Sequence, residues 1–448
     1  MEFLIIGAGV SGLTAGSILS EEFTTIIAER EPVRNPKEDL WVVLATPMLG
    51  SLRNIGVDEN ALDPIFLDNI QVHNSDGKVI FEYSYPITIT KLSKIRNAFL
   101  KNFQLDIMDK TFVSDDFIEE KGIIKKVRIE NKRSEVLRPE FIVDASGSSL
   151  LVSKRGLISQ FHKLYRHNIF RYFQTVFTDI NRSVIERETL HVIISDIFTP
   201  GGMSSLFIDG DKAHIMGFYN DFLSSVTPLQ RGRFIRNSLG VGGKFKVMRD
   251  WKIPLSHPII NPTYANTFFV GMANLSIYPF FMSGINHNAA QTSRLMKRLL
   301  DITSSGHDIE TIRLEYAMEF IYKHLFRGFL NDTMRVLLLG SRAYQLEEMI
   351  ATFFEILRII PKVSGTLSEL LVIARLVMDT LEKLGLTKKI EKMTSIMVEL
   401  HRIYEKKPDN INEVQEKAMK FNSFYNKKIE EILPEELKQK ISFKELRM

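Results

Sequence analysis

The order of apolar and polar positions divides this chain of 448 residues into two unlike parts. In the first part, short apolar runs such as Phe3–Ile6 and Thr24–Ala28 are separated by turn-forming or charged clusters, a pattern typical of β-strands. Residues 111–143 repeat this pattern and predict a strand meander. From Asp301 onward, glycine and proline become sparse and apolar residues recur at helical spacing. We therefore predict an α/β region followed by a helical C-terminal region.

The helical part contains several expected helices. Apolar residues recur mostly at three- and four-residue steps in Ile390–Tyr404, while Leu367–Leu386 is amphipathic, Met349–Ile360 is an apolar run and Asn412–Ile432 is strongly charged. Methionine-rich stripes on these segments are typical of an adaptable core. The alternative is that the helices cover a lipid channel and present lysine and arginine to anionic membrane headgroups.

One long run, Ile253–Ser293, contains no aspartate, glutamate, lysine or arginine. It does not predict a membrane span, because four prolines and two glycines interrupt it. No other window is long and apolar enough to span a bilayer. The chain opens directly on the strand-like Phe3–Ile6, so we expect no secretory signal and a cytoplasmic location. Peripheral contact with the inner face of a membrane stays open.

The composition excludes several classes of site. Lysine and arginine number 58 against 54 acidic residues, for a net charge of +4, which gives no argument for a nucleic-acid partner. The absence of cysteine excludes disulfides, thiolate metal sites and a cysteine nucleophile. The ten histidines show no spacing typical of a metal site, so we predict no metal. Abundant isoleucine, lysine and glutamate would suit a thermophile.

The N-terminal segment carries the first motif. An apolar strand runs into a glycine-rich turn and then a helix, and the next strand ends in an acid. The first glycine permits the tight turn, the second lets the backbone approach a pyrophosphate, and the third lets helix and strand pack closely. The helix N-terminus offers amides to phosphate, and the acid accepts from ribose hydroxyls. The predicted dinucleotide contacts are Gly7, Ala8, Gly9, Val10, Ser11, Gly12, Glu29 and Arg30.

A glycine-rich turn in an unrelated α/β domain is the alternative. The position of the motif at the start of a long chain favours FAD over NAD. Two later strands also end in glycine-containing turns. Phe141–Val143 leads into Asp144-Ala-Ser-Gly147, and Thr267–Val270 leads into Gly271-Met272. Beyond the second turn, Pro279 and Gly284-Ile-Asn precede an expected helix over residues 288–300.

These three segments, in this order and spacing, resemble the para-hydroxybenzoate-hydroxylase-like flavoproteins, and most closely the archaeal geranylgeranyl reductases. The segment Thr199–Phe218 resembles their substrate-sheet hairpin, and the part after Tyr316 resembles their helical tail. The resemblance implies an α/β FAD-binding Rossmann-like domain with an inserted antiparallel β-sheet substrate domain and a C-terminal α-helical region. The expected ranges are 1–75, 91–155 and 256–300 for the FAD-binding domain, 76–90 and 156–255 for the substrate domain, and 301–448 for the helical region.

The resemblance also implies roles for individual residues. Further FAD contacts are expected from Arg96, Asp144, Gly147, Gly271, Met272, Pro279, Gly284, Ile285 and Asn286. An apolar substrate, an isoprenoid lipid above all, is expected to contact Trp41, Phe207, Phe280, Phe281 and Met282. The uncharged run would then follow the isoalloxazine and open onto an apolar cavity, because a lone charge there would be costly to desolvate. The alternatives are an ordinary core strand for the run and a solvated helix charge for Arg96.

The chain departs from the family at four places near the flavin ring. Met272 stands where the family has an aspartate, and Met282 replaces the first glycine of its Pro-x-x-Gly-x-Gly segment. Residues 37–45 lack the cysteine of many relatives, and the aromatic Trp-x-Phe-Pro signature is reduced to Ser205–Asp209, which keeps Phe207. These changes spare the pyrophosphate site, so dinucleotide binding is better supported than any particular chemistry.

Three functions remain open at this point. The first is an FAD-dependent reductase of isoprenoid double bonds in a lipid or quinone tail, with ferredoxin or NAD(P)H as the electron donor. The second is an FAD-dependent monooxygenase of the same fold, and the third is a non-catalytic FAD-binding lipid carrier or complex subunit. Reduction of an unactivated alkene needs a proton donor. Tyr278 and His287 are the candidates, although a structural role is the more typical one for either.

Overall fold

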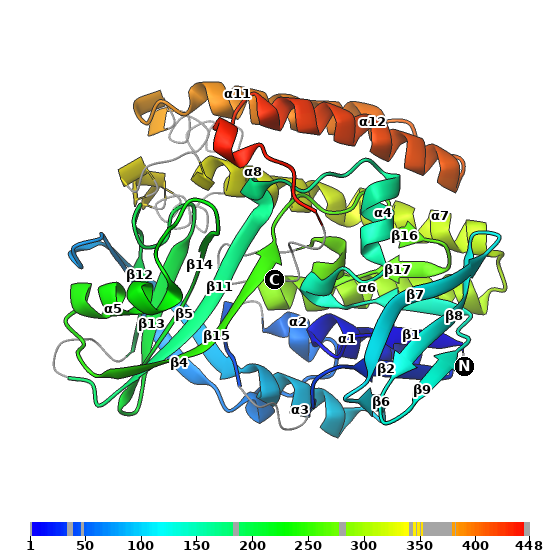
Figure 1. The fold of residues 1–448 in the computed structure, drawn as a ribbon, viewed down its shortest axis with the longest axis horizontal. Coiled ribbons are helices and arrows are strands. Elements are labelled where there is room, and N and C mark those ends of the chain that lie inside the picture. The colour runs from blue at the N-terminus through cyan, green and yellow to red at the C-terminus, as the bar shows by residue number, and fades with distance from the viewer. Residues whose placement is uncertain are drawn as a thin grey trace, which may run out of the picture.

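The computed structural model describes residues 2–33, 39–45, 49–181, 188–276, 284–339, 344–345, 347–349, 351–352, 379–380 and 382–442. Five predicted site residues lie outside these ranges: Tyr278, Pro279, Phe280, Phe281 and Met282. The expected helices at Met349–Ile360 and Leu367–Leu386 also lie largely outside them. The described elements form two sheet units side by side, with a layer of helices across both (Figure 1).

The first unit is a sheet in the order β16-β17-β10-β1-β2-β6, six strands within the described ranges. Its central strand, β1 (Phe3–Ile6), pairs in parallel with β2 (Thr25–Glu29) and β10 (Phe141–Asp144). Successive side chains of β1 point to opposite faces and are buried on both. Phe3 and Ile5 join the helical layer, whereas Leu4 and Ile6 pack against the antiparallel strands β7, β8 and β9.

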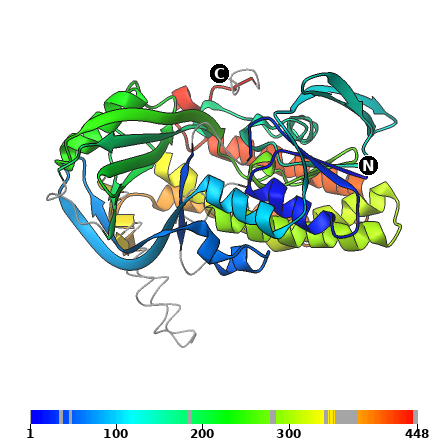
Figure 2. The ribbon, with the colours of Figure 1, turned by 90° about the horizontal axis from the view of Figure 1, so that it is seen from below.

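The remaining elements of this unit surround that sheet. Helix α1 (Val10–Leu19) contacts both α3 (Leu92–Asn102) and α6 (Gly284–Ser304) on one face (Figure 2). The other strands are β6 (Asp106–Asp109), β7 (Phe112–Glu120), β8 (Ile123–Glu130), β9 (Ser134–Leu137), β16 (Thr263–Tyr264) and β17 (Thr267–Phe269), and the short helices are α2 (Gly50–Arg53) and α4 (Ser153–Ser159). The predicted strand meander at residues 111–143 is confirmed by β7 to β10.

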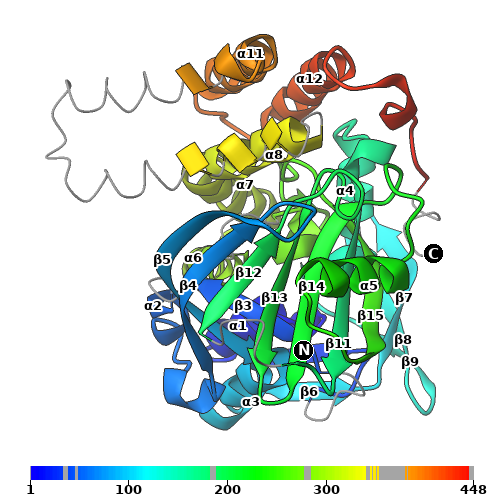
Figure 3. The same cartoon turned by 90° about the vertical axis from the view of Figure 1, so that its left-hand side faces the viewer.

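The second unit is a sheet in the order β15-β11-β14-β13-β12-β4-β5-β3, eight strands among the described residues. Figure 3 faces this sheet and shows it strongly curved. Helix α5 (Pro228–Ser238) covers its outer face, where Phe173, Phe177 and Ile235 form a separate apolar cluster. The strands are β15 (Lys244–Pro254), β11 (Ile169–Thr178), β14 (Lys212–Asn220), β13 (Met203–Asp209), β12 (Thr189–Ile193), β4 (Ile65–His73), β5 (Val79–Lys91) and β3 (Trp41–Ala45).

A side-chain amide joins the two ends of this curved sheet. Gln174 on β11 accepts a hydrogen bond from Trp41 N at 3.1 Å and donates one to Trp41 O at 2.6 Å. β3 is one edge of the sheet, and β11 is next to the opposite edge. The amide therefore bonds the backbone of Trp41 as a neighbouring strand would. It closes the sheet around the space on its inner face.

The expected domain boundaries need one correction. The range 1–75 was assigned to the first domain, yet β3 and β4 lie within it and belong to the second sheet. They do so because β4 pairs with β5 and β12, and β3 pairs with β5. The chain thus enters the second unit soon after β2, before it returns for α3.

The helical layer begins with α6 and continues through α7 (Ile309–Phe320), a π-helical turn (Ile321–Leu325) and α8 (Phe326–Leu339). Helices α11 (Thr387–Tyr404) and α12 (Ile411–Glu430) lie over α8 and α7 (Figure 1). The expected helices at residues 288–300, 390–404 and 412–432 are confirmed within α6, α11 and α12, although α12 ends at Glu430. Within the described part of the chain, no helix is long and apolar enough to cross a membrane.

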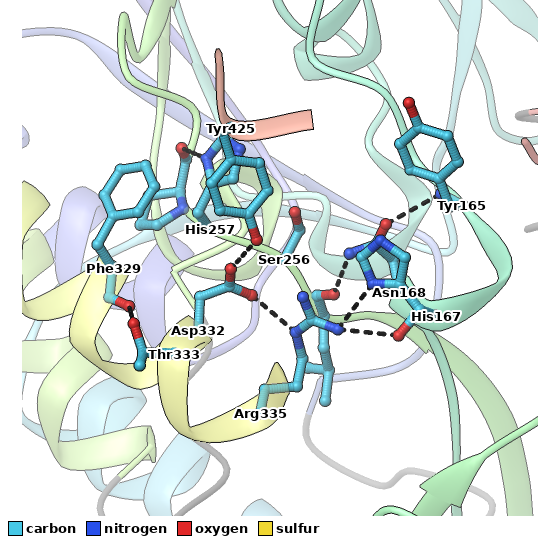
Figure 4. A network of polar contacts seen from close by, with 12 residues as sticks. Tyr165, His167, Asn168, Ser256, His257, Phe329, Asp332, Thr333, Arg335 and Tyr425 are labelled. Atoms are coloured by element: carbon cyan, nitrogen blue, oxygen red, sulfur yellow. Dashed lines mark hydrogen bonds and ion pairs between the residues drawn. The ribbon is translucent and has the colours of Figure 1, made fainter. Parts of the chain in front are cut away.

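A buried polar network pins the helical layer to the second sheet (Figure 4). Arg335 and Asp332 of α8 form an ion pair at 2.7 Å, with side chains only 2% and 1% exposed. Tyr425 of α12 donates a hydrogen bond to Asp332, and Arg335 donates one to the carbonyl of His167 at 2.9 Å. The network therefore connects α8, α12 and the chain entering β11.

Candidate functional site

The turn between β1 and α1 contains glycines of two kinds. A Cβ on Gly7 would lie 2.5 Å from the carbonyl oxygen of Ala145, and a Cβ on Gly12 would lie 1.8 Å from the carbonyl oxygen of Gly7. Both are therefore required by packing, and Gly7 also has a positive φ of 103°. Around a Cβ on Gly9, no described atom lies within 4 Å. Its φ of −69° suits any residue, so neither packing nor backbone conformation in the described structure requires a glycine here, and the space beside it can hold a ligand.

The N-terminus of α1 is open to an anion. Its N-cap is Gly9, which has no side chain to cap the helix, and the first turn carries no acid. The helical ladder begins with the bond from Leu13 N to Gly9 O, so the amides of Val10, Ser11 and Gly12 precede it. Those amides and the helix dipole favour a negative group beside Gly9. Shape and polarity at this turn fit a diphosphate.

The acid at the end of β2 lies beside the turn, as the motif requires. Glu29 accepts a hydrogen bond from Ala8 N at 2.6 Å through one oxygen and from Glu31 N at 2.8 Å through the other. A carboxylate has further lone pairs, so it can still accept from ribose hydroxyls. Arg30 is largely exposed, and its guanidinium forms an ion pair with Glu31 at 3.9 Å.

The second glycine-containing segment, Asp144–Gly147, packs against the turn. Asp144 is fully buried and accepts hydrogen bonds from Ser146 N at 3.0 Å and from Val152 N and Ser153 N at 2.8 Å each. Its carboxylate therefore shapes the backbone here and offers little to a ligand. Gly147, with a φ of 66°, lines the cavity described below.

The third segment closes against α1. A Cβ on Gly271 would lie 2.2 Å from Ser11 Oγ, so glycine is needed for this approach. Met272 lines the cavity where the resemblance led us to expect an aspartate. Gly284 and Ile285, at the start of α6, line the cavity too, whereas the side chain of Asn286 lies outside the described part.

Two polar atoms near this segment are buried without a protein partner. Asn288 lines the cavity, and its Oδ1 has no hydrogen bond within the described structure. Arg96 follows the cavity residue Leu92 by about one turn of α3, and its Nε is likewise buried and unpaired. Burying such atoms is costly unless a ligand satisfies them. For Arg96, this argues against the alternative of a solvated surface charge.

A cavity of about 410 Å³ separates the turn from the inner face of the second sheet. At one end lie Gly9, Val10, Ser11, Ala145, Gly147 and Met272. The sheet contributes Tyr172, Gln174, Val192, Met203, Ser205, Met216, Phe218, Trp251 and Ile253. Among the described lining residues there is no aspartate, glutamate, lysine, arginine or histidine. Such a lining disfavours a charged substrate, because a buried charge without a partner is costly.

Aromatic side chains form much of the cavity wall. The rings of Tyr172 and Trp251 lie 4.5 Å apart between centroids. Trp41 also lines the cavity, as expected, so both tryptophans of the chain face this space. The predicted substrate contact Phe207 lies behind Trp41, fully buried, with its ring 5.3 Å away and edge-on. Phe207 therefore supports the wall and is not part of its surface.

Tyr172 and Gln174 were not among the predicted site residues. Gln174 Nε2 donates to Tyr172 Oη at 2.8 Å, in addition to its two bonds with Trp41. Burial raises the pKa of the Tyr172 phenol, and the hydrogen bond from Gln174 opposes this rise. The resulting pKa is about 12. The phenol is thus protonated at neutral pH. The signal available in the sequence was alternation along β11, which puts these two polar groups on one face.

The proton-donor candidate His287 does not line the cavity in the described structure. Burial, together with the positive charge of Arg327, lowers its pKa to about 4. His287 in turn lowers the pKa of His324 in the π-helical turn, so it lies toward the helical layer. At neutral pH it is uncharged and has no proton of suitable acidity to give.

Comparison with known proteins bears on the fold. No family model and no curated protein matches the sequence. Among solved structures, a geranylgeranyl bacteriochlorophyll reductase-like protein from Thermoplasma acidophilum superposes with a TM-score of 0.67 at 15% identity, over 88% of this chain and 98% of that one. PqsL of Pseudomonas aeruginosa, named a probable FAD-dependent monooxygenase, gives 0.54 at 15% identity over 76% and 97%. The flavin-dependent brominase Bmp2 gives 0.57 at 13% identity over 79% and 92%.

At these identities the likeness establishes the fold. The chain has the fold of these flavoproteins, and the fold class predicted from the sequence is confirmed.

Proposed function

We propose that this chain is an FAD-dependent oxidoreductase that reduces an isolated double bond in an isoprenoid lipid or quinone tail. One observation carries the proposal. Gly9, whose side-chain position has no described atom within 4 Å, stands at a helix N-terminus and opens directly into an apolar cavity without charged lining residues among those described. A diphosphate explains the first feature, and an apolar substrate explains the second.

The residues present fit FAD. The amides of Val10, Ser11 and Gly12 would hold the diphosphate, and Glu29 would accept from the ribose. The unpaired Nε of Arg96 and Oδ1 of Asn288 are available to polar atoms of the cofactor. When bound and reduced, FAD supplies hydride chemistry. The chain's own part is to hold an uncharged substrate against the cofactor and to exclude water.

The replacement of the family aspartate by Met272 removes one expected polar contact to the cofactor. A hydrogen bond to a charged group contributes about 1.5–3 kcal/mol. One lost contact therefore weakens binding but does not abolish it, provided that the diphosphate site is intact. Met272 also keeps the lining apolar at the point where cofactor and substrate would meet.

A monooxygenase is the second candidate, because PqsL shares the fold over most of its length. The two reactions differ in their requirement for oxygen. We expect the FAD-loaded protein, reduced with dithionite under anaerobic conditions, to be reoxidised by a polyprenyl substrate with loss of a double bond. NAD(P)H oxidation that depends on both substrate and oxygen, without such anaerobic reoxidation, would support the monooxygenase. The same assay, with ferredoxin or NAD(P)H in place of dithionite, identifies the electron donor.

A further inference from the structure

The cavity holds one titratable side chain among its described lining residues, and that side chain is Tyr172. The other polar side-chain groups of the lining are the hydroxyls of Ser11 and Ser205, the amides of Gln174 and Asn288 and the indole N–H groups of Trp41 and Trp251. Aliphatic hydroxyls and amides are much weaker acids than a phenol, whose ordinary pKa is about 10. If the substrate in this cavity needs a proton from the protein, the phenol is therefore the best acid in reach.

The hydrogen bonds of Gln174 determine that the Tyr172 oxygen accepts a hydrogen bond from the amide and leaves its own hydrogen for another partner. Gln174 Oε1 must accept from Trp41 N, so its Nε2 is the atom that faces Trp41 O and Tyr172 Oη. Both hydrogens of this amide are thus donated, one to each oxygen. Tyr172 Oη accepts one of them, and its own hydrogen has no protein acceptor in the described structure.

We propose that Tyr172 donates the proton that completes reduction of the alkene, with Gln174 as its positioning residue. This inference rests on the proposed function. The alkene gains a hydride at one carbon, supplied by reduced FAD, and a proton at the other carbon as the O–H bond of Tyr172 breaks. The hydride carries the electron pair, so the flavin is oxidised and the alkene is reduced. Gln174 donates a hydrogen bond to the phenolate that remains, and water that enters after product release returns the proton.

The first test measures a single turnover. The variant Tyr172→Phe keeps the ring and its contact with Trp251 and removes only the hydroxyl. FAD-loaded wild type and variant are reduced with dithionite without oxygen and mixed with a polyprenyl substrate. We expect reoxidation to slow by about 100-fold or more in the variant, as for loss of a general acid. Tyr85→Phe is the matched control, because Tyr85 lies on β5 outside the cavity lining, and we expect it to react at the wild-type rate.

The second test needs no turnover. A medium-chain methyl ketone and the alkane of the same length are titrated into the FAD-loaded, oxidised protein, and binding is followed by the shift of the flavin absorbance spectrum. If the Tyr172 hydrogen points into the cavity, the ketone carbonyl accepts it. The preference for ketone over alkane should then fall about tenfold in Tyr172→Phe, the effect of one lost hydrogen bond. A merely structural role would weaken both ligands equally.

The outcomes separate the two proposals. Reoxidation of wild type by the substrate, slowed in Tyr172→Phe together with a lost ketone preference, supports the role of Tyr172. Wild-type reoxidation that is undiminished in the variant, or an unchanged ketone preference, overturns that role and leaves the reductase standing. If wild type is not reoxidised at all, the reductase function fails, and the role of Tyr172 fails with it.

Discussion

The variant Gly9→Val separates a glycine kept for a ligand from one kept for packing. No described atom lies within 4 Å of a Cβ at this position, and its backbone at φ −69° and ψ −179° suits valine. The folded chain should therefore lose no more than about 1 kcal/mol of unfolding free energy, the cost of a poorer N-cap. Gly12→Ala is the contrasting variant, because its Cβ would lie 1.8 Å from the carbonyl oxygen of Gly7.

Gly9→Val should impair FAD binding far more than it impairs stability. The valine side chain of Gly9→Val fills the space beside the first-turn amides and blocks the diphosphate. Loss of two hydrogen bonds to a charged group costs about 3–6 kcal/mol, which weakens FAD binding by more than about 100-fold. Gly12→Ala should lower stability by roughly 1–3 kcal/mol or more, because the backbone must move.

The assay is chemical denaturation of both variants without ligand, followed by calorimetric titration with FAD. Gly9→Val is expected to unfold like wild type and yet fail to bind. A folded Gly9→Val protein that binds FAD within tenfold of wild type would refute the placement of the diphosphate at this turn. An undiminished stability of Gly12→Ala would refute the packing argument for Gly12.

Three further predictions concern the cavity, the response to acid and the helical layer. Because both tryptophans line the cavity, FAD should quench the protein's fluorescence in wild type, Trp41→Phe and Trp251→Phe alike, and an unquenched variant would place the flavin elsewhere. Burial lowers the pKa of His257 from 6.5 to about 4, so the unfolded chain binds a proton first as pH falls. Stability should therefore drop between pH 6.5 and 4, by roughly 3 kcal/mol at most from this residue, and denaturation of His257→Phe should show a shallower slope. Removing one partner of the buried ion pair, as in Arg335→Met, should cost about 3–5 kcal/mol, whereas the double variant with Asp332→Leu should recover part of that loss; equal stabilities of wild type and Arg335→Met in denaturant would contradict this.

The sequence predicted the strand, the glycine-rich turn and the helix at the N-terminus because the contacts that form them are local. Gly7, Gly12 and Glu29 lie near one another along the chain, and each is required by a contact within a single strand-turn-helix unit. The fold was predicted through the resemblance that the three glycine-containing segments carry, since their order and spacing are those of a known group of flavoproteins. The role of Asp144 was harder to predict, because its hydrogen bonds to Val152 and Ser153 form only in the folded turn.

The apolar side of the site could not be predicted in the same way. Tyr172 and Trp251 come from strands that are distant along the chain, and they meet only because β11 and β15 pair. Gln174 contacts Trp41 only because the sheet curves until its ends approach. Phe207 was rightly expected on this sheet, but its depth behind Trp41 depends on the packing of neighbouring strands. Long-range contacts of this kind leave no pattern in a single sequence.

We infer that this chain holds FAD with its reactive ring in the apolar cavity. The amount of FAD that purified protein releases on denaturation, after saturation with FAD and removal of the excess, tests this inference. We expect close to one FAD for each chain, and a flavin spectrum that shifts when a polyprenyl substrate is added. Folded protein that retains no FAD after this treatment would contradict it.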